Sequence, residues 1–247
     1  MQDARKSSGG SEQVDSQLNA MREKAAAEAK DEGVTKDATL SMYQQQQLPR
    51  PRPSSSSPSS SPSASTLQSS SSPSPQSFVI WCTGLPSSGK TTIATMLKPK
   101  LKEYGLNAET LDGDILRKEL SPGLGFSKED IYTHTRKVIF LCNLLQQNRI
   151  VSIVSAVSPH KEIRDFIRHK VGNFVEVYVK CSLDTCIQRD CKGLYKKALN
   201  GKMNNLIGLQ IPYEEPVNPE IIANTEFDSC DNIVNKIISK LKDLGYL

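Results

Sequence analysis

The chain has 247 residues and a net charge of +4, with 31 Lys and Arg against 27 Asp and Glu. This excess is too small to indicate nucleic-acid binding, and no Lys/Arg-rich run with interleaved aromatic residues occurs. No apolar run approaches the roughly 18 to 20 residues that span a bilayer, and we find no secretory signal segment. Composition therefore predicts a protein that acts on neither nucleic acid nor membrane.

Residues 1–77 are predicted to be a disordered N-terminal extension. Ser and Pro dominate residues 50–77, and such a segment buries too little apolar surface to offset the entropy of ordering its backbone. Acidic residues such as Asp3 and Glu12 argue against an organelle transit peptide. The six cysteines include no C-x-x-C pair, which indicates free thiols in a reducing compartment. We expect a cytoplasmic protein, with organelle targeting by the extension left open.

Residues 78–247 have the size of one domain, and strand and helix signals alternate along them. Strands are expected over 78–83, 107–111, 150–157, 173–180 and 221–224, and helices over 91–104, 127–148, 160–170, 183–189 and 231–244. Pro99 should kink or split the first of these helices, and Ser127 should cap the second. Strands separated by helices pair in parallel through right-handed crossovers. The pattern predicts a three-layer α/β domain, with residues 192–219 forming a mobile lid.

A phosphate-binding motif lies between the first strand and the first helix. The pattern G-x-x-x-x-G-K-[ST] runs from Gly84 to Thr91. Its backbone N–H groups and the start of the next helix favour phosphate. Lys90 should reach the β- and γ-phosphates, and the Thr91 hydroxyl should ligate magnesium. ATP and Mg²⁺ are the predicted cofactors of a P-loop kinase fold. The predicted ATP-binding residues are Gly84, Leu85, Pro86, Ser87, Ser88, Gly89, Lys90, Thr91, Thr92 and, just before the lid, Arg189.

Two carboxylates follow the second predicted strand. Asp112 and Asp114 lie at the carboxyl end of that strand, the edge at which ligands of open α/β sheets bind. Because alternate residues point to opposite sides, the two should not share one role. We assign Asp112 to the metal and Asp114 to the acceptor, where it can take a proton from an attacking hydroxyl. The chain is thus predicted to be a phosphotransferase with an alcohol group as acceptor.

Six sequence blocks occur in the order and spacing of the adenylyl-sulfate kinases. They are the phosphate loop, L-D-G-D-x-x-R (111–117), L-G-F-S (124–127), S-P (158–159), R-D-x-K-G-L-Y-K-K-A (189–198) and P-Y-E-x-P-x-x-P-E (212–220). The resemblance covers residues 78 to about 226. It implies that ATP phosphorylates the ribose 3′-hydroxyl of adenylyl sulfate, the activation step of sulfate assimilation, and that the protein is a homodimer.

The resemblance also implies roles for single residues. Asp114 and Arg117 match positions that contact the acceptor, and Phe126 matches an aromatic residue that stacks on its base. Ser158 matches a serine beside the acceptor, so that Lys90, Asp114 and Ser158 form the predicted catalytic set. Lys192 matches a lysine that closes the lid over the substrates.

The acceptor side departs from the family pattern at four positions. Ile115 and His134 stand where the family has Asn, Ile131 replaces an Arg, and Leu206 replaces a second stacking aromatic. We still assign His134 and Leu206 to the acceptor pocket. Other cations would have to compensate for the missing charge: Lys161, Arg164 and Lys196. Otherwise the acceptor is another nucleotide diphosphate derivative, such as a cytidine type. A third hypothesis is a nucleotide-binding regulator without turnover.

Overall fold

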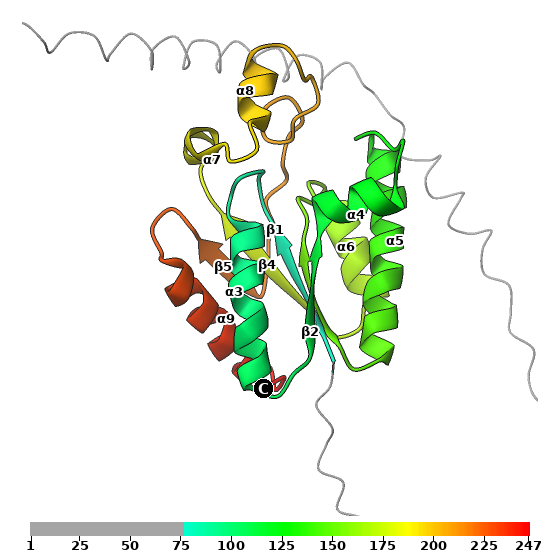
Figure 1. The fold of residues 1–247 in the computed structure, drawn as a ribbon, viewed down its shortest axis with the longest axis vertical. Coiled ribbons are helices and arrows are strands. Elements are labelled where there is room, and N and C mark those ends of the chain that lie inside the picture. The colour runs from blue at the N-terminus through cyan, green and yellow to red at the C-terminus, as the bar shows by residue number, and fades with distance from the viewer. Residues whose placement is uncertain (1–76) are drawn as a thin grey trace, which may run out of the picture. The chain divides into compact units, whose positions relative to one another are not determined.

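A computed structural model of the chain describes residues 77–247, and the predicted extension lies, apart from Ser77, outside the described residues. Five parallel strands form one sheet in the order β2-β3-β1-β4-β5 (Figure 1). Their bounds are Val79–Thr83 (β1), Ala108–Asp112 (β2), Val151–Ser155 (β3), Phe174–Lys180 (β4) and Ile221–Asn224 (β5). The predicted parallel sheet is confirmed, with β1 at its centre and the phosphate loop at the carboxyl end of β1.

Helices cover both faces of the sheet. The helices of residues 77–247 are α3 (Lys90–Glu103), α4 (Gly113–Leu120), α5 (Lys128–Gln147), α6 (Lys161–Lys170), α7 (Leu183–Arg189), α8 (Leu194–Leu199) and α9 (Cys230–Asp243). Helices α3 and α9 pack on one face, and α5 and α6 pack on the other (Figure 1). The predicted three-layer α/β fold is therefore confirmed. Each helix within residues 77–247 is too short or too polar to cross a lipid bilayer.

The alternation of side chains along β1 divides the core into two layers. Ile80 and Cys82 pack with α3 and α9, whereas Val79 and Trp81 pack with α5 and α6. All four side chains are buried, and full burial of a large apolar side chain contributes about 1.5–3 kcal/mol. The strand that carries the phosphate loop is thus fixed from both faces.

Two local predictions have different outcomes. Ser127 caps α5 as expected, because its hydroxyl accepts a hydrogen bond from the N–H of Asp130 at 3.1 Å. Helix α3, in contrast, runs unbroken through Pro99, so the expected split is wrong. Pro99 is exposed and lies in the last turns of the helix, between the fully buried Leu97 and Leu101. Packing of these leucines holds the helix where proline removes one backbone hydrogen bond.

Two short helices were not predicted. Residues 113–120, for which no element was predicted, form α4, whose eight residues are fewer than the roughly 11–18 over which an apolar repeat can be recognised. Helix α8 lies inside the predicted lid, and its Tyr195 and Ala198 are fully buried against Cys186 and Leu206. We call residues 192–219 the lid segment. The mobility predicted for it stays a prediction.

Candidate nucleotide and acceptor site

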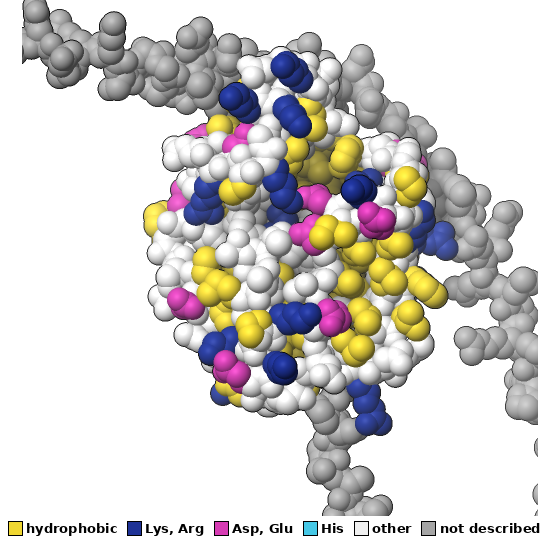
Figure 2. Space-filling view, viewed as in Figure 1, with side chains coloured by type: hydrophobic (Ala, Val, Ile, Leu, Met, Phe, Trp, Pro, Cys, Tyr) yellow, Lys and Arg dark blue, Asp and Glu magenta, His cyan; other side chains and the backbone are white. Residues whose placement is uncertain are grey.

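A cavity of about 560 Å³ lies at the carboxyl edge of the sheet, between the phosphate loop, α4, α5 and the lid segment. Charged side chains surround this hollow in Figure 2, with hydrophobic side chains deeper inside it. The structure brings most of the predicted site residues into its wall: Pro86, Ser87, Gly89, Lys90, Thr91, Thr92, Asp112, Asp114, Arg117, Phe126, His134, Ser158, Arg189, Lys192 and Leu206. Gly84, Leu85 and Ser88 belong to the same loop but do not line the cavity.

The phosphate loop depends on glycine at its first position. Gly84 has a φ of 151°, and a Cβ there would lie 2.4 Å from the carbonyl oxygen of Val179. Only glycine lets the loop pass so close to β4. Gly89, with a φ of 100°, precedes the first turn of α3, and its left-handed conformation directs the chain into the helix. The loop therefore presents backbone N–H groups at a helix N-terminus, the geometry that binds phosphate.

Lys90 is buried at the base of this loop. Its ammonium group donates hydrogen bonds to the carbonyl oxygens of Gly84 at 3.0 Å and Leu85 at 2.6 Å. Burial lowers the pKa of Lys90 to about 8, although nearby ionisable groups such as Cys186 and Asp114 oppose this shift. The ammonium is thus held by neutral carbonyl groups, and an anionic phosphate would stabilise its charged form.

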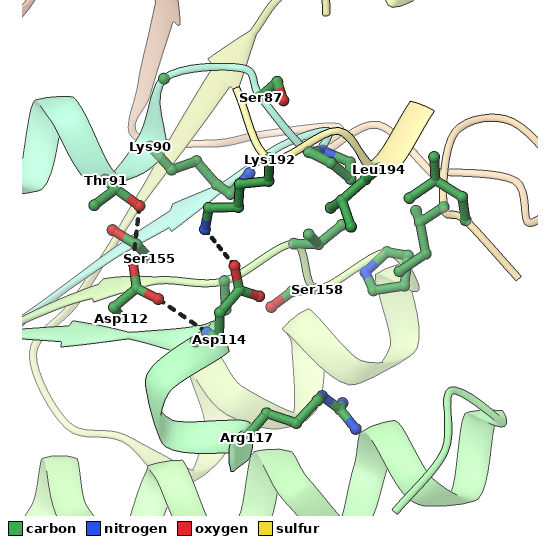
Figure 3. A pocket seen from close by; sticks show the side chains of 18 of the residues that line it. Ser87, Lys90, Thr91, Asp112, Asp114, Arg117, Ser155, Ser158, Lys192 and Leu194 are labelled. Atoms are coloured by element: carbon green, nitrogen blue, oxygen red, sulfur yellow. Dashed lines mark hydrogen bonds and ion pairs between the residues drawn. The ribbon is translucent and has the colours of Figure 1, made fainter. Parts of the chain in front are cut away.

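Three side chains with oxygen atoms that could bind a metal ion lie together beside the loop. Thr91 Oγ1 donates to Asp112 Oδ2 at 2.8 Å, and Ser155 lies opposite Asp112 in the β2–β3 register (Figure 3). The buried Ser155 hydroxyl has no hydrogen-bond partner in the part of the chain that the structure describes. Mg²⁺ prefers oxygen ligands and keeps several waters, so this set fits it. Residues 77–247 contain no group of three or more His, Cys, Asp or Glu able to hold a metal, so phosphate and water would complete its coordination.

The two carboxylates after β2 face different partners. Asp112 caps α4, since its Oδ1 accepts from the N–H groups of Asp114 at 2.9 Å and Ile115 at 3.4 Å. Asp114 instead forms an ion pair with Lys192 of the lid segment (Figure 3), and this hydrogen bond raises the pKa of Lys192. Asp112 therefore joins the Thr91 hydroxyl to the backbone that carries Asp114.

Arg117 and Phe126 form the outer wall of the cavity. The Arg117 guanidinium lies 4.7 Å from the centre of the Phe126 ring, and its Nη1 donates to the carbonyl of Gly125 at 2.8 Å. The Phe126 side chain remains 40% exposed. One face of the ring is stacked on a cation, and enough of the ring is open to contact a ligand.

His134 lies deeper, on α5. Its Nδ1 shares a hydrogen bond of 2.9 Å with the hydroxyl of Ser121, and the side chain is buried. Burial, followed by the charges of Arg117 and Lys137, lowers the pKa of His134 to about 4. The imidazole is therefore neutral near pH 7, and it adds a polar group to the cavity without adding a charge.

Ser158 is held in an uncommon backbone conformation. Its φ is 45°, a left-handed region that costs a residue with a Cβ roughly 1–2 kcal/mol. The buried hydroxyl accepts a hydrogen bond from Trp81 Nε1 at 3.0 Å. Trp81 is buried in the core and also lines the cavity.

Thr225 is a site residue that the sequence analysis missed. Its hydroxyl donates to the carbonyl of Ser88 at 2.8 Å, and its own carbonyl accepts from Arg189 Nη2 at 2.7 Å. Thr225 thus fixes the Arg189 guanidinium. Thr225 directly follows β5, at the edge where ligands of such sheets bind, and this position is the signal that would have indicated it.

Two tyrosines connect the lid segment to the body. The hydroxyl of Tyr195 donates to the carbonyl of Pro86 at 3.0 Å, and the hydroxyl of Tyr213 lies 2.9 Å from Thr83 Oγ1. Both contacts reach the chain at or next to the phosphate loop. The lid segment is therefore packed on the same loop that would hold ATP.

The sequence model of the family described as "Adenylylsulphate kinase" matches residues 76–224. This chain belongs to the adenylylsulphate kinase family. The adenylyl-sulfate kinase of Rippkaea orientalis is 50% identical over 172 residues, which cover 70% of this chain and 95% of the relative. The adenylyl-sulfate kinase of Gloeothece citriformis is 49% identical over 168 residues, covering 68% and 96%.

A solved relative shares the fold of this adenylylsulphate kinase domain. The APS kinase of Mycobacterium tuberculosis, determined in complex with AMPPNP and APS, is 35% identical and gives a TM-score of 0.65. The match covers 68% of this chain and 99% of the relative. The resemblance predicted from the six sequence blocks is therefore confirmed at the level of the family.

The adenylylsulphate kinase cavity of this chain has an apolar back wall. Ile131 and Leu206 are both buried and line it, whereas Ile115 is 63% exposed and does not. The three cations expected to compensate, Lys161, Arg164 and Lys196, lie outside the lining. Lysines and arginines that do line the cavity, within residues 77–247, are Lys90, Arg117, Arg189 and Lys192. None of these three side chains therefore supplies the cavity with the positive charge that the family has at position 131, where this chain has isoleucine.

Proposed function

We propose that this protein transfers the γ-phosphoryl group of ATP to the ribose 3′-hydroxyl of adenylyl sulfate, giving 3′-phosphoadenylyl sulfate and ADP in sulfate assimilation. One observation carries the proposal: a single cavity joins the phosphate loop, with Lys90 at its base, to Asp114 and Arg117. Family membership and the AMPPNP and APS bound to the relative from M. tuberculosis support the same reaction. Transfer between two bound nucleotides requires both sites to share one enclosure.

The phosphate loop and its helix hold ATP. Backbone N–H groups of residues 84–92 bind the phosphates, and Lys90 exchanges the carbonyls of Gly84 and Leu85 for phosphate oxygens. Thr91 and Asp112 would hold Mg²⁺, directly or through water, and the ion would supply charge neutralisation on the phosphates. Arg189, fixed by Thr225, lies where it can contact the same nucleotide.

Asp114 is the proposed base. The 3′-oxygen attacks the γ-phosphorus while its proton passes to the Asp114 carboxylate, and the bond from the γ-phosphorus to the bridging oxygen breaks, with its electron pair leaving on ADP. Because this in-line transfer needs no covalent enzyme intermediate, the Ser158 hydroxyl acts as a hydrogen-bonding group beside the acceptor. Lys192, now paired with Asp114, is close enough to contact the transferred group.

The acceptor nucleotide binds on the α4–α5 side. Arg117 contacts an anionic group of the acceptor, and the Phe126 ring stacks on the base. Neutral His134 offers a hydrogen bond, and Leu206 contributes apolar contact in place of a second ring. Together these residues give the acceptor a polar edge at α4 and an apolar back wall.

A panel assay tests the proposal. The full chain, with ATP and Mg²⁺, is offered adenylyl sulfate and, separately, cytidine and uridine diphosphate derivatives, and both ADP and the phosphorylated product are quantified. We expect turnover of adenylyl sulfate at the highest kcat/KM. A smaller pyrimidine acceptor is the second candidate. It is favoured because Ile131 and Leu206 stand where the family has a charge and a ring on the acceptor side. Preference for a cytidine derivative supports that candidate, and ATP binding without any transfer supports a regulator.

We also propose a cytoplasmic homodimer that acts on small nucleotides and on neither nucleic acid nor membrane. The exposed apolar side chains of Phe140 and Leu144 on α5 support a second copy as a partner. Sedimentation measures the dimer directly, and imaging of the tagged full chain measures the compartment. A monomer at micromolar concentration contradicts the first statement, and an organellar signal contradicts the second.

A further inference from the structure

Arg164 is a buried cation that lies outside the cavity. Its side chain is 4% exposed, and a buried arginine is rare unless it is paired. From α6 the guanidinium contacts three different segments: the loop after β3, strand β4 and the lid segment. Nη1 donates to the carbonyl of Ser158 at 2.7 Å, Nη2 donates to the carbonyl of Glu214 at 2.6 Å, and Nε pairs with Glu176 Oε1 of β4 at 3.2 Å. The planar donors of one side chain therefore fix two loops to the sheet.

The first loop carries Ser158, and Arg164 holds it at the carbonyl. The left-handed φ of Ser158 is unfavourable for a residue with a Cβ, and the following Pro159 restricts its backbone further. Trp81 Nε1 fixes the other end of the residue by donating to its hydroxyl at 3.0 Å. Because the indole uses a lone pair of that oxygen, the hydroxyl proton of Ser158 is free to donate to a ligand oxygen in the cavity.

The second loop is the end of the lid segment. The Glu214 N–H donates to the carbonyl of Pro159 at 2.9 Å, so the lid end and the Ser158 loop are also bonded directly. The guanidinium carbon of Arg164 lies 5.7 Å from the centre of the Tyr213 ring, and the Tyr213 hydroxyl reaches Thr83 beside the phosphate loop. Arg164 is thus the charged centre of the junction between the lid segment and the acceptor side.

We infer that Arg164 is a positioning residue for the acceptor: it holds the Ser158 hydroxyl and the end of the lid segment in the geometry that binds the second nucleotide. It does not touch substrate, since it lies outside the cavity lining. The inference rests on the proposed function, because it assigns Ser158 to the acceptor. The inference predicts that a change at Arg164 weakens binding of the acceptor and not of ATP, since the phosphate loop makes no contact with the Arg164 side chain.

Arg164→Lys in the full chain tests this selectivity. Lysine keeps the charge for Glu176, but its single ammonium cannot reproduce the planar pair of bonds to Ser158 and Glu214. We expect the KM for adenylyl sulfate to rise about tenfold, the change expected from one lost charge-assisted hydrogen bond, while the KM for ATP stays within about twofold. Arg168→Lys is the matched control, because Arg168 lies on the same helix and also pairs with Glu176 but bonds Glu220. It should leave both KM values unchanged.

A double-mutant cycle separates positioning from general stability. If Arg164 acts through Ser158, then Arg164→Lys should add little to the acceptor KM of Ser158→Ala. Amide exchange supplies a readout independent of activity: residues 157–160 should exchange faster in Arg164→Lys, and residues 84–91 should not. Arg164→Gln, which keeps an amide NH₂ donor group but no charge, is the second variant if the lysine variant does not fold.

The outcomes are distinguishable. Three results would overturn the positioning role and leave the proposed function intact. They are an equal rise in both KM values in Arg164→Lys, the same rise in the acceptor KM in Arg168→Lys, and full additivity of Arg164→Lys with Ser158→Ala. Absence of adenylyl sulfate turnover by the unmodified chain, measured first, overturns the proposed function and with it the acceptor role of Ser158.

Discussion

The phosphate side and the acceptor side of the cavity are built in different ways. The phosphate side is built mainly on one continuous stretch, residues 84–92, whose ligands are mostly backbone N–H groups and one buried lysine, with Asp112 and Arg189 added from elsewhere. The acceptor side is assembled from α4, α5, the loop after β3 and the lid segment, and it uses side chains throughout. A substitution on the acceptor side should therefore change a single contact. The phosphate side uses backbone groups, so its geometry depends on the sequence of the loop as a whole.

The largest effect should follow from Lys90→Ala. Loss of the only lysine of residues 84–92 removes charge stabilisation from the transferred group, and we expect kcat/KM to fall by about 10³ or more. The fold should persist, because removing a buried ammonium whose pKa is lowered to about 8 relieves a cost of burial. Steady-state kinetics and thermal unfolding measure the two effects.

Lys98→Ala is the control for that change, since Lys98 lies on the same helix and pairs with Glu109 at the surface. Activity within a few-fold of the unmodified protein is expected. Retained turnover in Lys90→Ala would show that the phosphate side does not depend on this ammonium.

Asp114→Asn should act on the acceptor side alone. The amide cannot accept the hydroxyl proton, and general-base contributions are about 10²–10⁴ in rate, so kcat should fall in that range. The affinity for AMPPNP, measured by calorimetry, should stay the same. Glu119→Gln, an exposed position on the same helix, should change neither quantity, and an unchanged kcat in Asp114→Asn would contradict the proposed base.

Acid should weaken the acceptor side through His134. Its pKa is about 4 in the folded protein against 6.5 for the unperturbed group, so the unfolded chain binds more protons between these values and stability falls as pH drops through this window. At pH 5 the loss is about 1–2 kcal/mol relative to pH 8. Urea unfolding at the two pH values measures it.

The control for this acid effect is His134→Gln, which cannot titrate and should lose less stability between pH 8 and pH 5. Equal acid sensitivity in both proteins would place the cause at other groups.

Alkaline pH should weaken the phosphate side through Lys90. Its pKa is about 8 when the site holds no phosphate, and bound phosphates favour the charged form, so ATP binding takes up a proton above pH 8. The affinity for Mg-ATP should be about tenfold lower at pH 9 than at pH 7. Calorimetry in buffers with different ionisation enthalpies measures the uptake, and zero uptake at pH 9 contradicts the assignment.

The smallest effect is expected from Leu206→Phe. Restoring a ring to the cavity wall adds an aromatic contact of about 0.5–1.5 kcal/mol, so the KM for adenylyl sulfate should fall several-fold, with no change in the KM for ATP. Leu209→Phe is the matched control, because Leu209 is buried in the same cluster but does not line the cavity. The same response in both variants would mean that the ring acts on packing alone.

The difference between the two sides also explains what the sequence alone could predict. The strands, the phosphate loop and the cap at Ser127 follow from local patterns of apolar residues, glycine and hydroxyl groups. Helix α4 was missed because its eight residues are fewer than the roughly 11–18 over which an apolar repeat can be recognised. The place of Thr225 after β5 was readable from the sequence, but the contacts of Thr225 and Arg164 were beyond local patterns, since the partners lie 137 and 50 residues away in the chain. Such contacts become visible only when the sheet edge brings distant segments together.

The ion pair between Lys192 and Asp114 has a consequence for how the substrates enter. Both side chains are more than half exposed, and a pair screened in this way contributes little to stability. Separating it therefore costs little free energy when an incoming hydroxyl takes the place of the lysine. The pair thus keeps Asp114 directed toward the cavity and Lys192, the first residue of the lid segment, beside it, in a contact that substrate binding can open.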